Sequence, residues 1–380
     1  MNRTCIILLA VVALASSVSP IHAADVNQLT ETINNIGSDG KGYPEAVAAM
    51  ESLSQLDQSS VPSILAAIDE EKPVSANWLR GAVEAIAQKA QQSGNPVTSE
   101  TLVRFIESDK HSPKSRSVAF HLLKQQDAPT ADSLVPSFTN DASLELRLLA
   151  VARLMNQASA FVEKEQATDA IATYKAALDA TRNAYQAQQI ADALEKLDVE
   201  VDTTEHFGFL KSWHLIAPFE FAKGDGFDAT YPPEQKIDLT ARYPGKLVDE
   251  LPGPAAWKKV DLGSGKKRVD FNKTFAPVKE VVGYAVTRFD SDKPQVVELR
   301  WGSPNATKVW VNEKLIAADK VYHAGDNFDQ YSASAELNAG ENTILVKVVQ
   351  NEQTQSWTNV WHFELRVCDH LGTAIRDVKP

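Results

Sequence analysis

The sequence predicts a multidomain protein of the class α then β, with an N-terminal α-solenoid of helical hairpins followed by an antiparallel β-sandwich or jelly roll. Between residues 43 and 198, apolar residues recur at helical spacing in blocks separated by short polar breaks. After residue 198 the hydrophobic period falls from about 3.6 residues to about 2, the period of a β-strand. We therefore expect a signal peptide (1–23), a helical repeat domain (24–198), a linker (199–211) and a β-sandwich (212–380).

The N-terminus has the pattern of a secretory signal peptide. Arg3 precedes an apolar run over 6–15, and small residues lead to Ala23, with cleavage after Ala23 or Ala24. The run is shorter than the roughly 20 residues that a membrane-spanning helix requires, and no later run is comparable. We expect no membrane span and an exported protein, either periplasmic or extracellular.

Cysteine content and charge restrict the partners. Cys368 is the one thiol left after signal removal, so no internal disulfide forms, and its apolar surroundings predict a buried, inert thiol. The formal charge of −12 is concentrated in residues 24–204, which carry 15 Lys and Arg against 26 Asp and Glu. An acidic helical region disfavours nucleic acid. The sequence predicts a protein partner on the helical repeats.

The helical blocks come in pairs, such as VPSILAAIDE followed by ANWLRGAVEAIAQKA, and an arginine stands near the start of each second helix: Arg80, Arg116 and Arg147. No such pair buries its apolar face until the next pair stacks on it, as in solenoids. Over residues 44–157 the pattern resembles HEAT repeats. This resemblance implies that Arg116 contacts an acid at a neighbouring turn, Asp109 or Asp69. An ordinary helical bundle is the alternative, and residues 167–198 read as one capping hairpin.

Eight short strands are predicted in the second half, with no helices between them. They are WHLIAPF, RVDFN, VVGYAVTRF, QVVELRW, TKVWVN, SASAEL, NTILVKVVQ and VWHFELRV. This succession is typical of an antiparallel sandwich or jelly roll. In the first of them, Pro218 cannot donate a ladder hydrogen bond and is expected to end the strand.

Two stretches, VELRWGSPNATKVWVNEKLI and LNAGENTILVKVV, resemble the sugar-binding jelly roll of family-two glycoside hydrolases, a galactose-binding-like domain. When residues 212–234 and the closing VWHFELRVCDHLGTAIRDV are included, the whole region resembles the C-terminal module of exported HEAT-repeat proteins of planctomycete-type bacteria. The resemblance implies a glycan or protein ligand. One turn reads Asn312-Glu313 in place of Asn-Gly, so a type I′ hairpin would force Glu313 to a positive φ.

No catalytic or metal motif stands out. The chain lacks H-E-x-x-H, G-x-S-x-G, Walker and Rossmann signatures, and its histidines show no metal spacing. Asp225 and Asp228 offer too few oxygens for a calcium loop. We interpret their segment as a surface crossing anchored by Phe227 and Tyr231. The prediction is a non-enzyme without cofactor or metal.

Tryptophan is concentrated in the second half, where an exposed indole would stack on a sugar and a buried one would pack the core. The candidate ligand-binding residues are Trp301, Asn305 and Trp357, with core or rim packing as the alternative for both indoles. We predict an exported, non-catalytic scaffold that binds protein through its repeats and glycan or protein through its jelly roll. The alternative is a carbohydrate-active enzyme or accessory subunit of a glycoside hydrolase, favoured by a cleft with two carboxylates roughly 5–10 Å apart.

Overall fold

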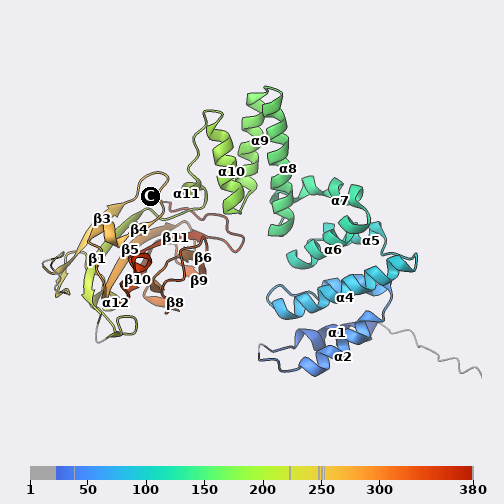
Figure 1. The fold of residues 1–380 in the computed structure, drawn as a ribbon, viewed down its shortest axis with the longest axis horizontal. Helices are drawn as coiled ribbons and strands as arrows, with labels where there is room; N and C mark the ends of the chain where they lie inside the picture. The colour runs from blue at the N-terminus through green and yellow to red at the C-terminus, as the bar shows by residue number, and fades with distance from the viewer. Residues whose placement is uncertain are drawn as a thin grey trace, which may run out of the picture. The chain divides into compact units, whose positions relative to one another are not determined.

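The computed structural model describes residues 23–37, 39–221, 224–246, 249, 251 and 253–378. The predicted signal peptide lies outside these residues, except that Ala23 begins the first helix. The chain divides into two compact units, residues 1–146 and 147–380. Helices occupy the N-terminal half and antiparallel sheets the C-terminal half, which confirms the order α then β (Figure 1). Within the described residues, no helix has the length and apolar character needed to cross a membrane.

The first unit is built from short helices that pack as sequential neighbours, α1 on α2, α3 on α4 and α5 on α6. Their bounds are α1 Ala23–Asn34, α2 Tyr43–Ser54, η1 Gln58–Ser60, α3 Val61–Ala66, α4 Pro73–Gln92, α5 Ser99–Glu107, α6 Pro113–Gln126, α7 Ala128–Leu134 and η2 Val135–Asn140. Polar breaks in the sequence supply the caps: the side chains of Thr98 and Ser112 accept from backbone N–H groups at the starts of α5 and α6.

Arg116 makes the main buried ion pair of this unit, and its partner corrects the prediction. Its Nη1 and Nη2 donate to the two carboxylate oxygens of Asp141 at 2.8 and 2.7 Å, and its Nε donates to the Ile106 carbonyl. The expected partners, Asp109 and Asp69, were wrong, because the guanidinium extends to the turn after η2 and not to an earlier turn. An acid at a neighbouring turn does meet the arginine, in the opposite direction along the chain.

The second unit begins with helices whose apolar faces share one cluster. Their bounds are α8 Leu144–Glu163, which crosses the division between the units, α9 Ala167–Ala180, α10 Ala184–Glu195 and α11 Thr203–His206. The predicted linker 199–211 needs correction, because it contains α11 and its Phe207 and Phe209 are buried in the cluster of α9 and α10. Asp202 caps α11 and pairs with Lys211 at 2.7 Å. This segment is therefore packed and not extended.

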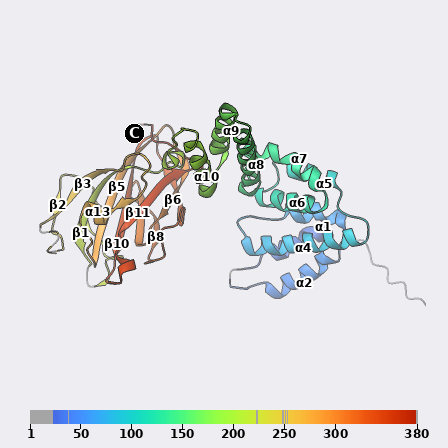
Figure 2. The same cartoon turned by 45° about the horizontal axis from the view of Figure 1, so that its top comes forward.

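Eleven strands among the described residues form a seven-stranded sheet, in the order β2-β3-β1-β5-β10-β7-β8, and a four-stranded sheet, β4-β11-β6-β9 (Figure 2). All paired strands are antiparallel. Their bounds are β1 Ser212–Glu220, β2 Arg242–Tyr243, β3 Ala255–Asp261, β4 Val269–Asp270, β5 Val281–Ser291, β6 Gln295–Gly302, β7 Ala306–Val311, β8 Lys314–Asp319, β9 Tyr331–Leu337, β10 Gly340–Gln350 and β11 His362–Cys368, with the short helices α12 Pro232–Gln235, α13 Phe271–Thr274 and η4 Ser356–Thr358 between them.

The two sheets share one core, in which Trp213, Trp361 and Phe363 are buried. Cys368 lies at its edge and is buried, as predicted, and burial raises the pKa of its thiol to about 11. Pro218 does not end β1 as expected, because a β-bulge between 216 and 219 lets the strand continue past it to Glu220. The predicted strain at Glu313 is confirmed, with φ of 48° at Asn312 and 67° at Glu313 in the β7–β8 turn.

The other face of the seven-stranded sheet, which we call the outer face, carries a second apolar cluster that includes Ile216, Tyr284, Val286 and Leu345. Strand β5 is therefore buried on both of its faces over most of its length. Part of the outer face is covered by a stretch between β1 and β2 that includes Phe227, Ala229 and Tyr231, and we call it the covering segment. The buried Phe227 and the partly buried Tyr231 anchor this covering segment, in agreement with the prediction.

Candidate functional site

Two of the three predicted ligand-binding residues are structural. Trp301 is 1% exposed, and its Nε1 donates to Thr307 Oγ1 at 3.1 Å, so of the two alternatives the structure shows core packing. Asn305 is also 1% exposed. Its amide nitrogen donates to Gln350 Oε1 and the Val360 carbonyl, and its oxygen accepts from the His362 N–H. Asn305 therefore ties a loop to β10 and β11, and its amide faces no solvent.

Trp357 is the predicted residue that does lie on the surface. It belongs to η4 and is 64% exposed. Its ring meets His323 edge to face, with centroids 5.3 Å apart, and His323 Nε2 lies 3.0 Å from Asn351 Oδ1. Because Asn351 Oδ1 can only accept, this ring nitrogen carries the proton. The imidazole is thereby fixed and supports one edge of the indole.

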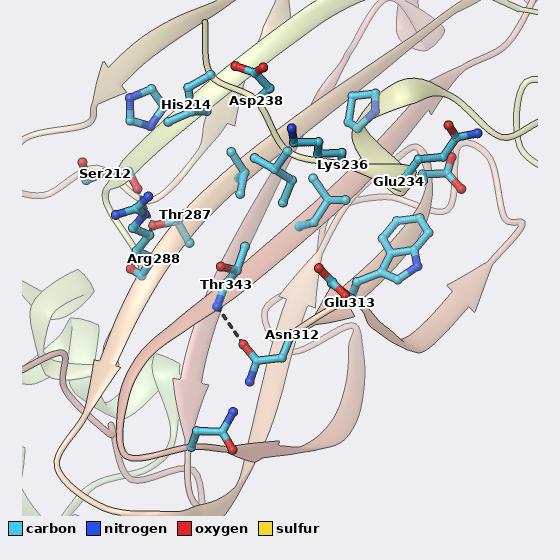
Figure 3. A pocket seen from close by; sticks show the side chains of 18 of the residues that line it. Ser212, His214, Glu234, Lys236, Asp238, Thr287, Arg288, Asn312, Glu313 and Thr343 are labelled. Atoms are coloured by element: carbon cyan, nitrogen blue, oxygen red, sulfur yellow. Dashed lines mark hydrogen bonds between the residues drawn. The ribbon is translucent and has the colours of Figure 1, made fainter. Parts of the chain in front are cut away.

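A larger concavity, of about 1060 Å³, crosses the outer face of the seven-stranded sheet (Figure 3). We call it the sheet groove. Residues of β1, β5, β10 and β7 line its floor, and residues 233–239, which run from α12 into the following loop, line one wall. Sequence reasoning did not identify this site, because it is formed by strands that lie far apart in the chain.

Strand register places four groove residues in one line across the sheet. His214 of β1 pairs with Val286 of β5, Val286 pairs with Leu345 of β10, and Leu345 pairs with Trp310 of β7. Directly paired residues point to the same face, so these four side chains form what we call the open row. Three strand spacings make it roughly 14 Å long. Val286 and Leu345 form a nearly buried base, and His214 and Trp310 are partly exposed at its ends.

Polar groups stand beside the open row. Thr343 of β10 pairs with Arg288 of β5, one step along the same face. In Figure 3 the Asn312 side chain points toward the backbone of Thr343, where its Oδ1 accepts from the Thr343 N–H at 3.0 Å. The Asn312 amide nitrogen donates to Asn342 Oδ1 at 2.8 Å. These bonds fix the polar rim of the groove without a ligand.

The next line of residues on the same face is closed. Ile216, Tyr284, Lys347 and Lys308 are paired across the same four strands, and we call them the covered row. Lys347 is fully buried, and its Nζ donates to the carbonyls of Phe227 and Ala229 at 2.9 and 2.6 Å and to Glu234 Oε1 at 3.0 Å. The covering segment is thus held to the sheet by a lysine, and it ends at the groove wall.

Two of the four carboxylates that line the groove, Glu234 and Asp238, are engaged by other groups of the protein. Glu234 accepts from both Lys347 Nζ and the Tyr284 hydroxyl. Asp238 accepts from the side chain and backbone of Thr240, and these bonds lower its pKa. A glycosidase acid requires a raised pKa. In the described part of the chain, the carboxyls with raised pKa are Asp319 and Glu364, and neither lines the groove.

The surroundings of His214 favour its neutral imidazole, although the carboxylate of Asp261 acts in the opposite direction. Burial is the main cause of its lowered pKa, and the nearby positive charges of Lys259 and Arg288 lower it further. A neutral imidazole both donates and accepts a hydrogen bond. The groove therefore offers His214 as a two-way partner for a hydroxyl.

The acidic loop that the sequence suggested is occupied by a lysine. Lys320 Nζ lies 3.1 Å from Asp225 and 2.8 Å from Asp228, and Lys308 Nζ lies 3.9 Å from Asp228, so two lysines stand against the two carboxylates. No group of three or more His, Cys, Asp or Glu side chains in the described ranges is arranged to hold a metal ion.

Comparison with known proteins identifies no family. No family model matches the chain, and no curated protein matches it. Two solved structures of a beta-glucosidase from Kluyveromyces marxianus, one Se-Met labelled and one in complex with glucose, are each 12% identical to it. They cover 30% and 36% of this chain with TM-scores of 0.23 and 0.24, and this chain covers 14% and 16% of theirs. A similarity this low carries no argument about function.

Proposed function

We propose that this chain is an exported, non-catalytic scaffold whose two sheets form a galactose-binding-like jelly roll that binds a glycan chain along the sheet groove. The open row is the observation that supports the proposal. It offers an indole, two aliphatic side chains and an imidazole in one line. Its length of roughly 14 Å suits an extended ligand more than a single small molecule.

The chemistry of the groove matches that of a sugar ring, which has a face of C–H groups and a rim of hydroxyls. An indole binds the C–H face, and neutral donors and acceptors bind the hydroxyls. Trp310 supplies the indole, and His214 and Thr343 supply the neutral donors and acceptors. Because Asn312 is already fixed by its bonds to β10, the β7–β8 turn needs little ordering on binding.

We further propose that the helical pairs form a HEAT-like solenoid that binds a protein partner. The bidentate bond between Arg116 and Asp141 supports this, because it joins α6 to the turn after η2 as a solenoid ladder would. The excess of acidic residues over 24–204 favours a basic partner surface.

The test is a glycan-array screen of the full chain, followed by titration of the best hit. We expect Trp310→Ala to weaken binding about 5- to 100-fold, the scale of losing one stacked indole, while EDTA has no effect. Trp357→Ala is the matched control, because Trp357 is exposed and lies outside the groove. Circular dichroism checks that both variants are folded.

The result also locates the site. Loss of binding in Trp357→Ala with Trp310→Ala unchanged would move the ligand to the η4 loop, where Trp357 is the second candidate platform. Release of reducing sugar from the bound glycan would contradict the non-catalytic assignment and favour a carbohydrate-active enzyme or an accessory subunit of a glycoside hydrolase. Absence of binding to any glycan would overturn the glycan proposal.

A further inference from the structure

A second cavity, of about 190 Å³, lies in the second unit where the α9–α10 loop meets the loop after β11. Its lining residues are Asp179, Arg182, His206, Gly372, Thr373, Ala374 and Arg376. The charged lining is thus two arginines and one carboxylate, and we call the cavity the arginine pocket. None of these residues lines the sheet groove. The pocket is therefore separate from the proposed glycan site.

Arg182 carries a positive charge that no carboxylate of the described residues balances at ion-pair distance. Its Nε donates to Thr373 Oγ1 at 3.0 Å, and its Nη1 donates to the carbonyls of Asp179 and Thr181 at 2.8 Å each. All three acceptors are neutral oxygens, and Nη2 donates to no described residue. Asp179 and Asp369 act on this half-buried charge only from beyond ion-pair distance, so an anion in direct contact with the guanidinium would stabilise it.

Further positive charge surrounds this guanidinium. Burial is the largest of the effects that lower the pKa of Arg182. The neighbouring guanidiniums of Arg147 and Arg366 lower the pKa further, whereas the carboxylates of Asp369 and Asp179 raise it. On the pocket's outer side, Arg376 forms an exposed ion pair with Glu205 at 3.1 Å. Exposed pairs of this kind exchange partners readily because they are weak.

The pocket walls are held in place without a ligand. Arg366 is buried and bound to both carboxylate oxygens of Asp329, and its Nη1 donates to the carbonyls of Phe207 and Gly372 at 3.3 and 3.0 Å. Gly208 brings the chain after α11 close to the C-terminal loop, since a Cβ there would lie 2.8 Å from the Cβ of Ala374. The site is therefore already formed.

We propose that the arginine pocket binds an oxyanion, in the form of a carboxylate, phosphate or sulfate group. The planar guanidinium matches two oxygens of such a group, and Nη2 of Arg182 and the fork of Arg376 are the donors. A volume of about 190 Å³ accepts one such group and not a glycan chain. An anion there bridges the helical hairpin and the loop after β11, so binding should raise the thermal stability of the second unit.

The test is thermal unfolding of the full chain in phosphate, sulfate or acetate against chloride at equal ionic strength. We expect a rise in Tm that saturates with at least one of the three anions, whereas the general effect of phosphate and sulfate on proteins does not saturate. In Arg376→Gln, the anion concentration that gives half of the saturating rise in Tm (the midpoint) should be about tenfold higher, because one charged donor is lost. Arg104→Gln is the matched control, an exposed arginine of α5 paired with Glu100, and its midpoint should not change.

Arg182→Gln should remove the saturable rise altogether, and Arg376→Gln keeps the test valid if Arg182→Gln does not fold. The anion with the lowest midpoint identifies the preferred group. A rise that fails to saturate with all three anions would overturn the proposal. So would equal midpoints in the wild type and Arg376→Gln.

Discussion

The open row and the covered row occupy adjacent lines on one face of one sheet, yet they differ in what lies over them. In the covered row, Lys347 and Tyr284 hold a segment of the same chain by binding its carbonyls and Glu234. In the open row, His214 and Trp310 face a groove. The apolar side chains of this sheet face need a cover, and here the chain supplies part of it.

This difference separates a structural use of polar side chains from a binding use. The polar atoms of the covered row are paired inside the protein, where losing one partner leaves the other buried and unsatisfied. In the open row, His214 and Trp310 at the two ends remain accessible for an external partner, over a base of buried Val286 and Leu345. Substitutions in the covered row should therefore change stability, and those in the open row should change binding.

The largest effect is expected for Lys347→Ala. It would leave two carbonyls without their donor and the Glu234 carboxylate without its positive partner, with only the Tyr284 hydroxyl still donating to it, at a cost of about 3–5 kcal/mol in the free energy of unfolding. Urea unfolding measures this. Lys320→Ala is the matched control, a lysine after β8 that binds the same covering segment, since its pairs with Asp225 and Asp228 are exposed and should contribute little to stability. Equal losses in both variants would remove the distinction between buried and exposed lysines.

Tyr284→Phe should have an intermediate effect. It removes one hydrogen bond to a carboxylate that Lys347 still binds, and we expect a loss of about 1.5–3 kcal/mol in unfolding free energy with no change in glycan affinity. A paired titration with the best array hit checks the second part. A change in affinity larger than the change in stability would show that the covered row takes part in binding.

Thr343→Val should give the reverse pattern. The substitution keeps the size of the side chain and removes a hydroxyl at the rim of the open row, so glycan binding should weaken by about 1 kcal/mol, roughly fivefold, while unfolding changes little. Ser332→Ala, an exposed hydroxyl of β9 on the other sheet, is the control and should leave affinity intact. Equal weakening by both substitutions would contradict a role for the groove.

The smallest effect is expected from the protonation of His214. Its pKa is lowered in the folded protein, so the unfolded chain binds the proton more readily and stability falls as the pH drops below the ordinary histidine range. The contribution is complete above about pH 6.5 and is lost as the pH falls through the folded value. His214→Gln should reduce this slope between pH 7 and 5 but not abolish it, because His111, His206 and His362 also have a lowered pKa. An unchanged slope would mean that His214 is not shifted.

Local patterns were sufficient to predict the helices between residues 43 and 198 and most strands, but not α1 or the short helices α12 and α13. Helical spacing and helix caps depend only on residues a few positions apart in the chain. The same is true of the short β7–β8 turn that places Glu313 at a positive φ. The sequence did not predict strands β2, β3 and β8. The sequence of β3, AAWKKVD, lacks the alternation of apolar and polar residues that the predicted strands have. Arg116 was expected to pair with an acid, but the direction of the pairing depends on how the helices pack.

The candidate site depends on register, which the sequence does not reveal. His214 and Trp310 are far apart in the chain, and they share a line because three successive strand pairings place them there. One signal was available: Lys347 interrupts the apolar strand NTILVKVVQ, and a lysine in a central strand requires buried acceptors. Trp301 and Asn305 were chosen for their loop-edge positions, and burial of both depends on packing between the sheets.

Locating the bound ligand tests directly whether the open row is the binding surface. Hydrogen–deuterium exchange of the full chain, with and without a saturating array hit, measures this location. If the ligand lies on the open row, exchange should become slower in residues 233–239, in the β7–β8 turn and at the β1 end that carries His214. Protection confined to the loop around Trp357, with no change in those three segments, would contradict it.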